Sequence, residues 1–213
     1  NKCQEIQNRC SDRFETVLSR LGRQFESDKT YYTSNLDYMN ALWIAFKQLF
    51  NKGLIYRGKK VMPYSYGCQT ALSNFEANQN YQSVNHTSLY LKFKLADKEN
   101  EFFLVWTTTP WSLLANQALC LNPKLEYVLV NANENYWVAK ELYSKIFKND
   151  EPIIKTSLGK DLNNIQYLPV FNFINQSIFR TLNDEYVTSE SGTGIVHMAP
   201  LFGADDFRVC MDY

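Results

Sequence analysis

Residues 87–95, Thr87-Ser-Leu-Tyr-Leu-Lys-Phe-Lys-Leu95, decide the fold class because apolar and polar side chains alternate along them. A period of two is typical of a β-strand with one buried face. Other short strand-like segments lie at 102–106, 126–131, 136–139, 152–156 and 193–197. Residues 140–147 favour a short helix. Many short strands with irregular connections predict a closed or nearly closed, barrel-like β-structure with a few short helices.

The pattern in the first part of the chain is helical instead. Apolar residues recur at helical spacing over residues 4–21, and Gly22 follows where a helix would end. The spacing is clearer over residues 35–52, where Asn35 or the serine before it can cap the start and Gly53 the end. We therefore expect two helices before the strands begin.

Charge changes together with secondary structure. Residues 1–80 carry 11 Lys+Arg against 7 Asp+Glu, a net charge of +4, and residues 81–213 carry −4. Both changes place a boundary near residues 80–86. We predict an α+β chain, with a helical and extended stalk over residues 1–80 and a β-rich module over residues 81–213.

The composition is that of an ordinary globular protein, with 45% hydrophobic and 21% charged residues. No run of about 18 apolar residues occurs, so we expect no membrane-spanning helix. The start lacks Met and an apolar signal core, which suggests an excised fragment. Five cysteines without a C-x-x-C pair favour free thiols in a reducing cytoplasm. Only two histidines occur, and we expect no metal site.

The first candidate site is Trp106-Thr-Thr-Thr-Pro-Trp-Ser-Leu-Leu-Ala-Asn116, which follows a predicted buried strand. One interpretation is a strand end rich in β-branched residues, followed by a turn before a helix. The other is a pocket lined by hydroxyls. Because each hydroxyl can donate and accept, a threonine cluster can hold a water molecule and a ribose together.

The second candidate site is Gly192-Thr-Gly-Ile-Val-His-Met-Ala-Pro-Leu-Phe-Gly-Ala-Asp-Asp-Phe207. A single histidine at a strand end is more often structural, and two aspartates at a helix start are more often caps. Alternatively, His197 and one of the aspartates face a common cleft across the Pro/Gly loop. There a carboxylate can pair with an ammonium group, and a histidine can bond to a substrate oxygen.

Together the two segments resemble the editing insertion of class I isoleucyl-tRNA synthetases, of the eukaryotic type. The earlier stretch Val61-Met-Pro-Tyr-Ser-Tyr-Gly-Cys-Gln-Thr-Ala-Leu-Ser-Asn-Phe-Glu-Ala77 is also similar to that family. The resemblance covers nearly the whole chain, from about Cys3 to Tyr213. Related valyl and leucyl enzymes have Arg-Pro where this chain has Thr109-Pro110-Trp111, which favours the isoleucyl branch.

The resemblance implies roles for individual residues. Thr107, Thr108 and Thr109 would position the terminal ribose and the attacking water. His197 would contact the aminoacyl group and help to exclude isoleucine, and Asp206, which directly precedes an aromatic residue, would bind the α-ammonium. A second set would bind substrate or support the threonine-rich segment: Trp106, Ser112, Asn116 and Gly194.

The sequence departs from the family in two respects. Ser112 stands where the family often has threonine, and Cys68 lacks the second cysteine that completes a zinc pair in bacterial relatives. The adenylate-forming signatures are absent, so ATP and Mg²⁺ are expected only for the full-length enzyme. Residues 1–80 would border its catalytic body, and no cofactor is expected here. The partners implied are that body and the 3′ end of tRNA(Ile) carrying valine, without a membrane.

Two rival functions stay open. The first is the editing domain of a valyl enzyme, which would remove threonine. The second is a non-catalytic RNA-binding β-barrel in which Trp106, Trp111 and tyrosines stack on bases. The net negative charge of residues 81–213 argues against the second, because nonspecific binding to nucleic acid needs a basic face. For the same reason, the isolated chain can be folded and yet inactive without the rest of the synthetase.

Overall fold

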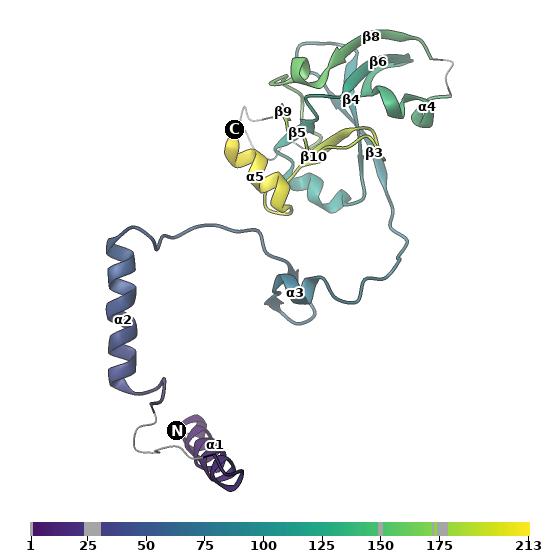
Figure 1. The fold of residues 1–213 in the computed structure, drawn as a ribbon. Helices are drawn as coiled ribbons and strands as arrows, with labels where there is room; N and C mark the ends of the chain where they lie inside the picture. Colours follow the sequence, from purple (N-terminus) through teal and green to yellow (C-terminus); the bar gives the residue numbers. More distant parts are fainter. Residues whose placement is uncertain (1, 24–30, 149–150, 172, 174–178) are drawn as a thin grey trace. The chain divides into compact units, whose positions relative to one another are not determined.

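The computed structural model describes residues 2–23, 31–148, 151–171, 173 and 179–213. The chain divides into two compact units, residues 1–59 and residues 60–213. Both units are drawn in Figure 1. The functional boundary expected near residues 80–86 stays a prediction. None of the described helices is long and apolar enough to cross a bilayer.

The first unit contains the two predicted helices. Helix α1 spans Lys2–Arg20 and helix α2 spans Leu36–Asn51. Asn35 is the N-cap of α2, as expected, although its side chain makes no capping hydrogen bond. No residue of α2 is buried, so its apolar stripe is solvent-exposed in this structure. The helices are confirmed, but nothing shows that they form a stalk.

The second unit begins with small elements that the sequence did not predict. Strands β1 (Tyr64–Ser65) and β2 (Thr70–Ala71) form a hairpin. Helix α3 (Asn74–Ala77) follows it. Ser73 and Glu76 form a capping box at its start, in which each side chain accepts a bond from the other residue's backbone N–H.

Five of the predicted strand segments form one sheet with the order β3-β4-β7-β6-β8. The strands are β3 (Leu89–Lys94), β4 (Glu101–Thr107), β6 (Glu126–Ala132), β7 (Glu134–Ala139) and β8 (Ile153–Leu158). All neighbours are antiparallel except β4 and β7, which pair in parallel. The helix expected over residues 140–147 is present as the 3-10 turn η3 (Lys140–Leu142) followed by α4 (Tyr143–Ile146).

A second sheet has the order β10-β5-β9. Its strands are β5 (Ala118–Leu121), β9 (Arg180–Asn183) and β10 (Ile195–Met198). The expectation of a barrel-like closed structure was wrong. Within the described residues, the strands form separate sheets of five, three and two strands. The α+β class is confirmed.

The main hydrophobic core lies between the two larger sheets. Phe93 and Phe103 from the five-stranded sheet pack in one cluster with Leu119 and Ile195 from the three-stranded sheet. The Tyr127 hydroxyl also joins the sheets, because it donates to the Gly194 carbonyl over 2.7 Å. This packing fixes the end of β4 relative to β10, which is where both candidate motifs lie.

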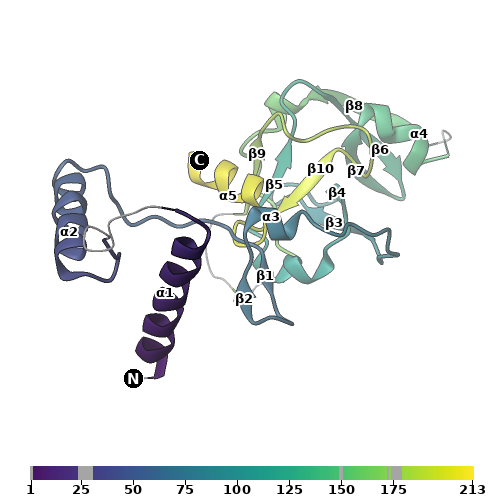
Figure 2. The ribbon, with the colours of Figure 1, turned by 60° about the horizontal axis from the view of Figure 1, so that its bottom comes forward.

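Three further elements complete the module. The 3-10 helix η2 (Pro110–Ala115) follows β4 and starts at the proline, and η4 (Gly159–Leu162) follows β8. Helix α5 (Ala204–Asp212) lies against the three-stranded sheet (Figure 2). Its Val209 packs with Ala118 and Met198 of that sheet. The start of α5 is thereby held close to the end of β10.

Candidate functional site

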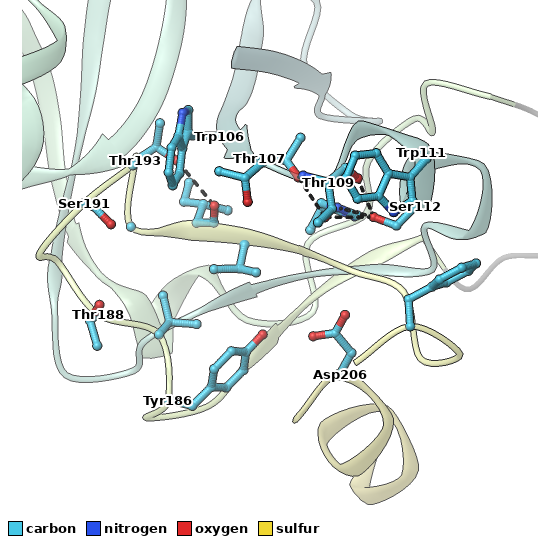
Figure 3. Close-up of a pocket in the computed structure, with 18 residues that line it drawn as sticks. Trp106, Thr107, Thr109, Trp111, Ser112, Tyr186, Thr188, Ser191, Thr193 and Asp206 are labelled. Atoms are coloured by element: carbon cyan, nitrogen blue, oxygen red, sulfur yellow. Dashed lines mark hydrogen bonds between the residues drawn. The ribbon is translucent and has the colours of Figure 1, made fainter. Parts of the chain in front are cut away.

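A cavity of about 410 Å³ lies where the end of β4, η2, β10 and the start of α5 meet (Figure 3). Hydroxyl, imidazole and carboxylate groups line it together with aliphatic and aromatic side chains. The lining residues are Trp106, Thr107, Thr108, Thr109, Trp111, Ser112, Tyr186, Val187, Thr188, Ser191, Gly192, Thr193, Gly194, Ile195, Val196, His197, Phe202 and Asp206.

One wall of the cavity is a chain of hydroxyls. The Thr109 N–H donates to Thr107 Oγ1 over 3.1 Å, and the two threonine hydroxyls lie 3.4 Å apart. Thr109 Oγ1 lies 3.2 Å from Ser112 Oγ, which in turn donates to the Thr109 carbonyl over 2.7 Å. Pro110 begins a 3-10 turn after the strand, and this turn places the Ser112 side chain beside the threonine hydroxyls at the strand end. We call Thr107, Thr109 and Ser112 the hydroxyl wall.

His197 joins the hydroxyl wall to β10. Its Nε2 lies 3.1 Å from Ser112 Oγ, and its Nδ1 is buried without a hydrogen-bond partner among the described residues. The residue is 6% exposed. Burial lowers the pKa of His197 below its usual 6.5, and the nearby charge of Asp206 opposes this only in part. The imidazole is therefore neutral at pH 7.

Asp206 lies in the first turn of α5 and belongs to the opposite wall. Its Oδ2 accepts a hydrogen bond from the Ala199 N–H over 2.9 Å, so it fixes the loop after β10 rather than capping the helix. Burial raises the pKa of Asp206 above its usual 3.8, although the Ala199 N–H and His197 lower it. A bound cation stabilises the ionised form of a carboxylate whose pKa is raised by burial.

Tyr186 lies beside Asp206 on that wall. Its hydroxyl points toward the carboxylate in Figure 3 and helps to lower the pKa of Asp206, although it makes no fully formed hydrogen bond among the described residues. Buried polar atoms are rarely left unpaired, and such an atom often marks a ligand or water position. We call Tyr186 and Asp206 the acidic wall.

The loop before β10 passes very close to the sheet. Gly192 and Gly194 have positive φ values of 74° and 72°. A Cβ at Gly192 would lie 2.8 Å from the Trp106 ring, and one at Gly194 would lie 2.4 Å from Ala139 Cβ. Only glycine permits both this backbone conformation and this approach.

The structure brings most of the predicted site residues together. Eight of them line the cavity: Trp106, Thr107, Thr108, Thr109, Ser112, Gly194, His197 and Asp206. Asp206 lines it and Asp205 does not, which agrees with the choice between them. The side chain of Asp205 is 65% exposed and lies 3.7 Å from Arg208.

Asn116 is the exception, because it does not line the cavity. Its Oδ1 accepts from the Tyr167 hydroxyl over 2.7 Å, and its Nδ2 donates to the Ala118 carbonyl over 3.0 Å. The amide is thus occupied inside the fold. Neither bond is to the threonines, so its role in supporting that segment stays a prediction, and direct contact with a substrate would require these bonds to break.

Sequence reasoning missed the residues that precede the glycine loop. Tyr186, Val187 and Thr188 line the cavity but belong to no recognisable motif. They reach it because the chain turns back from β9 to β10, and the sequence did not predict β9. The only local signal was their position just before Gly192 in a stretch rich in hydroxyl side chains.

No metal site is evident in the part of the chain that the structure describes. No three His, Cys, Asp or Glu side chains there are grouped to hold a metal ion. Cys68 lies exposed in the turn of the β1–β2 hairpin, where its N–H donates to Ser65 Oγ over 3.1 Å. The donors that line the cavity, one carboxylate, one imidazole and several hydroxyls, are suited to an organic substrate with an ammonium group.

The chain is similar in sequence to a known family. The profile of tRNA synthetases class I (I, L, M and V) matches residues 1–190. The cytoplasmic isoleucine--tRNA ligase of Mus musculus is 42% identical over the whole chain, which covers 18% of that protein. The isoleucine--tRNA ligase of Bdellovibrio bacteriovorus is 40% identical over 98% of the chain and 21% of that protein. The chain therefore spans about a fifth of the length of these relatives.

Solved structures are similar to part of the chain. The crystal structure of GlLeuRS-CP1 aligns with a TM-score of 0.51 and 17% identity, over 59% of each chain. The P. knowlesi cytosolic leucyl-tRNA synthetase editing domain aligns with a TM-score of 0.49 and 15% identity, over 59% of this chain and 60% of that one. The first similarity shows a shared fold.

Proposed function

Since the chain belongs to the class I tRNA synthetases of the isoleucyl, leucyl, methionyl and valyl group, we propose that its cavity is the editing site of an isoleucine--tRNA ligase. The reaction proposed is hydrolysis of the ester that joins valine to tRNA(Ile). The observation that carries this proposal is that Thr107, Thr108 and Thr109 share one cavity with Asp206. The names of the relatives support the choice of the isoleucyl branch.

The cavity offers a complementary group for each part of an aminoacyl ester. Asp206 would bind the α-ammonium, because a partly buried carboxylate gains most from a cation that arrives with three N–H donors. Thr107, Thr108 and Thr109 would hold the terminal ribose and the attacking water. Figure 3 shows Thr107 and Thr109 apart from Asp206, on the other side of the cavity. An ester held between the two walls would be fixed at both ends.

The proposed reaction is direct attack by water. The water oxygen forms a bond to the ester carbonyl carbon, the bond from that carbon to the ribose oxygen breaks, and the ribose oxygen takes up a proton. Free valine and tRNA are the products. Holding the ester and the water in place supplies most of the rate, because an aminoacyl ester is already activated.

A covalent route through cysteine is disfavoured. Burial raises the pKa of Cys120 to about 12 and that of Cys210 to about 11, so neither is a thiolate at pH 7. Neither lines the cavity. Cys3, Cys10 and Cys68 are exposed outside it. The water route uses no metal or other cofactor. ATP and Mg²⁺ are proposed only for the full-length ligase.

Size selection explains why a second site is needed. Isoleucine and valine differ by one methylene, and a pocket can reject the smaller by only about 1–3 kcal/mol, a magnitude for which isoleucyl enzymes are themselves the usual example. We propose that His197, Val187 and Ile195 limit the room for the side chain so that valine enters and isoleucine does not. The proposed partners are the 3′ end of tRNA(Ile) and the catalytic body of the same synthetase, in the cytoplasm.

The function is tested by deacylation of Val-tRNA(Ile), with Ile-tRNA(Ile) and Thr-tRNA(Val) as matched substrates. The 3′-valyl ester of adenosine is added because it needs no contacts to the tRNA body. We expect hydrolysis of both valyl esters and little of Ile-tRNA(Ile). Faster release of threonine would favour the valyl alternative. RNA binding without hydrolysis of any ester, including valyl-adenosine, would favour the non-catalytic alternative and contradict the proposal.

A further inference from the structure

The two ring nitrogens of His197 are in very different situations. Nε2 lies 3.1 Å from Ser112 Oγ, whereas Nδ1 has no partner among the described residues. The side chain is 94% removed from solvent and lines the cavity. Ser112 therefore occupies Nε2, whereas Nδ1 is enclosed by protein atoms and receives no hydrogen bond from the described residues.

The direction of the Ser112 hydrogen bond decides which ring nitrogen carries the proton. Ser112 has one hydroxyl hydrogen, and its shortest contact is to the Thr109 carbonyl, over 2.7 Å. A carbonyl can only accept, so the serine hydrogen belongs to that bond. Ser112 Oγ must then act as the acceptor toward His197, and Nε2 must be the protonated nitrogen.

The other tautomer is less favourable in this arrangement. With the proton on Nδ1, the ring would bury an N–H donor without a partner, and Ser112 would have to turn its hydrogen from the carbonyl to Nε2. Unpaired buried N–H groups are rarer in proteins than unpaired acceptors. Thr109 Oγ1, 3.2 Å from Ser112 Oγ, can donate to the second lone pair and strengthens the same direction.

We propose that Ser112 is a positioning residue that holds His197 as the Nε2–H tautomer, with its buried Nδ1 unprotonated, and so fixes the orientation of the imidazole that lines the cavity. This inference rests on the proposed function and deepens it. It commits the Nε2–H of His197 to Ser112 and leaves Nδ1 without a proton, so His197 does not donate a hydrogen bond to a substrate oxygen. Ser112 on the hydroxyl wall would thus set which nitrogen of His197 carries the proton.

The geometry separates this role from that of a serine nucleophile. Ser112 is 3% exposed, and its hydrogen is directed to a carbonyl instead of to the imidazole. A serine nucleophile needs the reverse direction, with its hydroxyl donating to histidine and a third group orienting the other ring nitrogen. No such third group is bonded to Nδ1 within the described residues.

The tautomer can be measured directly by ¹⁵N NMR of the imidazole nitrogens in this chain at neutral pH. The chain has only two histidines, and a His86→Gln variant assigns the spectrum. We expect His197 to show a protonated Nε2 and an unprotonated Nδ1. Ser112→Thr, which keeps the hydroxyl, should preserve this pattern. Ser112→Ala, which removes the acceptor, should populate the Nδ1–H form.

Deacylation of Val-tRNA(Ile) by the unchanged protein, Ser112→Thr and Ser112→Ala tests the functional consequence. Loss of a partner that orients a functional histidine costs about 10- to 100-fold in activity or ligand affinity at metal sites, and we expect a loss of that size for Ser112→Ala. A rise in KM would show that the orientation of the imidazole matters for binding of the ester, and a fall in kcat would show that it matters for hydrolysis. Ser112→Thr should restore the activity.

Several results would overturn the inference. They are a protonated Nδ1 in the unchanged protein, an unchanged tautomer in Ser112→Ala, or a changed tautomer with unchanged deacylation. If the unchanged protein hydrolyses no ester, the proposed function fails. The NMR result still decides whether Ser112 sets the tautomer, so the two failures are distinguishable.

Discussion

The two walls of the cavity differ in how their polar groups are satisfied. On the hydroxyl wall, Thr107, Thr109 and Ser112 bond to one another and to the backbone. On the acidic wall, the buried Tyr186 hydroxyl makes no fully formed hydrogen bond, and burial raises the pKa of Asp206. The polar groups of the hydroxyl wall are therefore satisfied without a ligand. Those of the acidic wall are satisfied only when a ligand brings a hydrogen-bond donor.

This difference suggests that the two walls contribute differently to substrate binding and to stability. A prebonded wall keeps its shape and costs little to organise when substrate binds, whereas unpaired groups lower stability and recover that cost on binding. We therefore expect substitutions on the acidic wall to reduce binding strongly with little loss of stability. Substitutions on the hydroxyl wall should reduce stability as well.

The largest effect is expected for Asp206→Asn, which keeps the shape of the side chain and removes its charge. Loss of one partner of a buried charge pair costs about 2–5 kcal/mol, which corresponds to a loss of about 30-fold to several thousand-fold in kcat/KM for Val-tRNA(Ile). Because the ionised Asp206 is itself unfavourable in the free protein, the unfolding free energy should not fall.

Asp205→Asn is the matched control, since it makes the same chemical change one residue earlier on an exposed side chain. Deacylation by this variant should stay within about twofold of the unchanged protein, as for other exposed charges. Equal losses in the two variants would mean that net charge near α5 matters, and not the carboxylate in the cavity.

The pH dependence of deacylation should show the next largest effect. Activity needs Asp206 ionised and His197 neutral, and acidification removes both conditions. The pKa of Asp206 is raised above 3.8 and that of His197 is lowered below 6.5, so the rate should fall as pH decreases between these values. Full activity that persists to pH 4 would contradict the assignment of both residues.

The same two groups have opposite effects on stability. The folded-state pKa of His197 is below its unfolded value, so its contribution to stability is present at neutral pH and is lost as pH falls below 6.5. The folded-state pKa of Asp206 is above its unfolded value, so acidification through that pKa adds stability. Chemical denaturation of Asp206→Asn over this pH range should show the loss of stability that His197 causes, without the gain that Asp206 provides.

A smaller loss is expected for Tyr186→Phe, which removes only the hydroxyl. We expect Tyr186 to receive a hydrogen bond from the α-ammonium beside Asp206. Such a bond to a charged group is worth about 1.5–3 kcal/mol, so KM should rise about tenfold or more. The unfolding free energy should stay the same or increase, because the free protein no longer buries an unpaired hydroxyl. A marked loss of stability would show that the hydroxyl already has a partner.

The smallest effect is expected for Thr107→Val. In contrast to Tyr186→Phe, this substitution should lower the stability. Valine has nearly the same shape but cannot accept the hydrogen bond from the Thr109 N–H. The unfolding free energy should fall by about 1 kcal/mol in chemical denaturation. Thr108→Val, on an exposed neighbour, should change it by less than about 0.5 kcal/mol. A stable Thr107→Val protein would remove the distinction between the walls.

The sequence predicted the elements whose pattern is local. Strands β3, β4 and β6 show alternation or a buried run, and helix α2 shows helical spacing. It missed β5, whose four residues Ala118–Leu121 are all buried and carry no alternation. Without β5 and its partner β9, the strands left over suggested a barrel. Sheet order depends on distant pairings, which no local pattern records.

The candidate site was predicted more fully than the fold. Two compact motifs supplied eight lining residues, because the threonines and the glycine loop are each continuous in sequence. Asn116 was assigned to the site through the family resemblance, yet its bonds to Tyr167 and Ala118 lie inside the fold. Tyr186 was missed because the fold alone brings it to Asp206.

The most direct test of the central claim is a crystal structure of the chain with a non-hydrolysable valyl-adenosine analogue. We predict the α-ammonium against the Asp206 carboxylate and the ribose beside Thr107, Thr108 and Thr109. An analogue that binds outside this cavity, or binds inside it with the ammonium away from Asp206, would contradict the account.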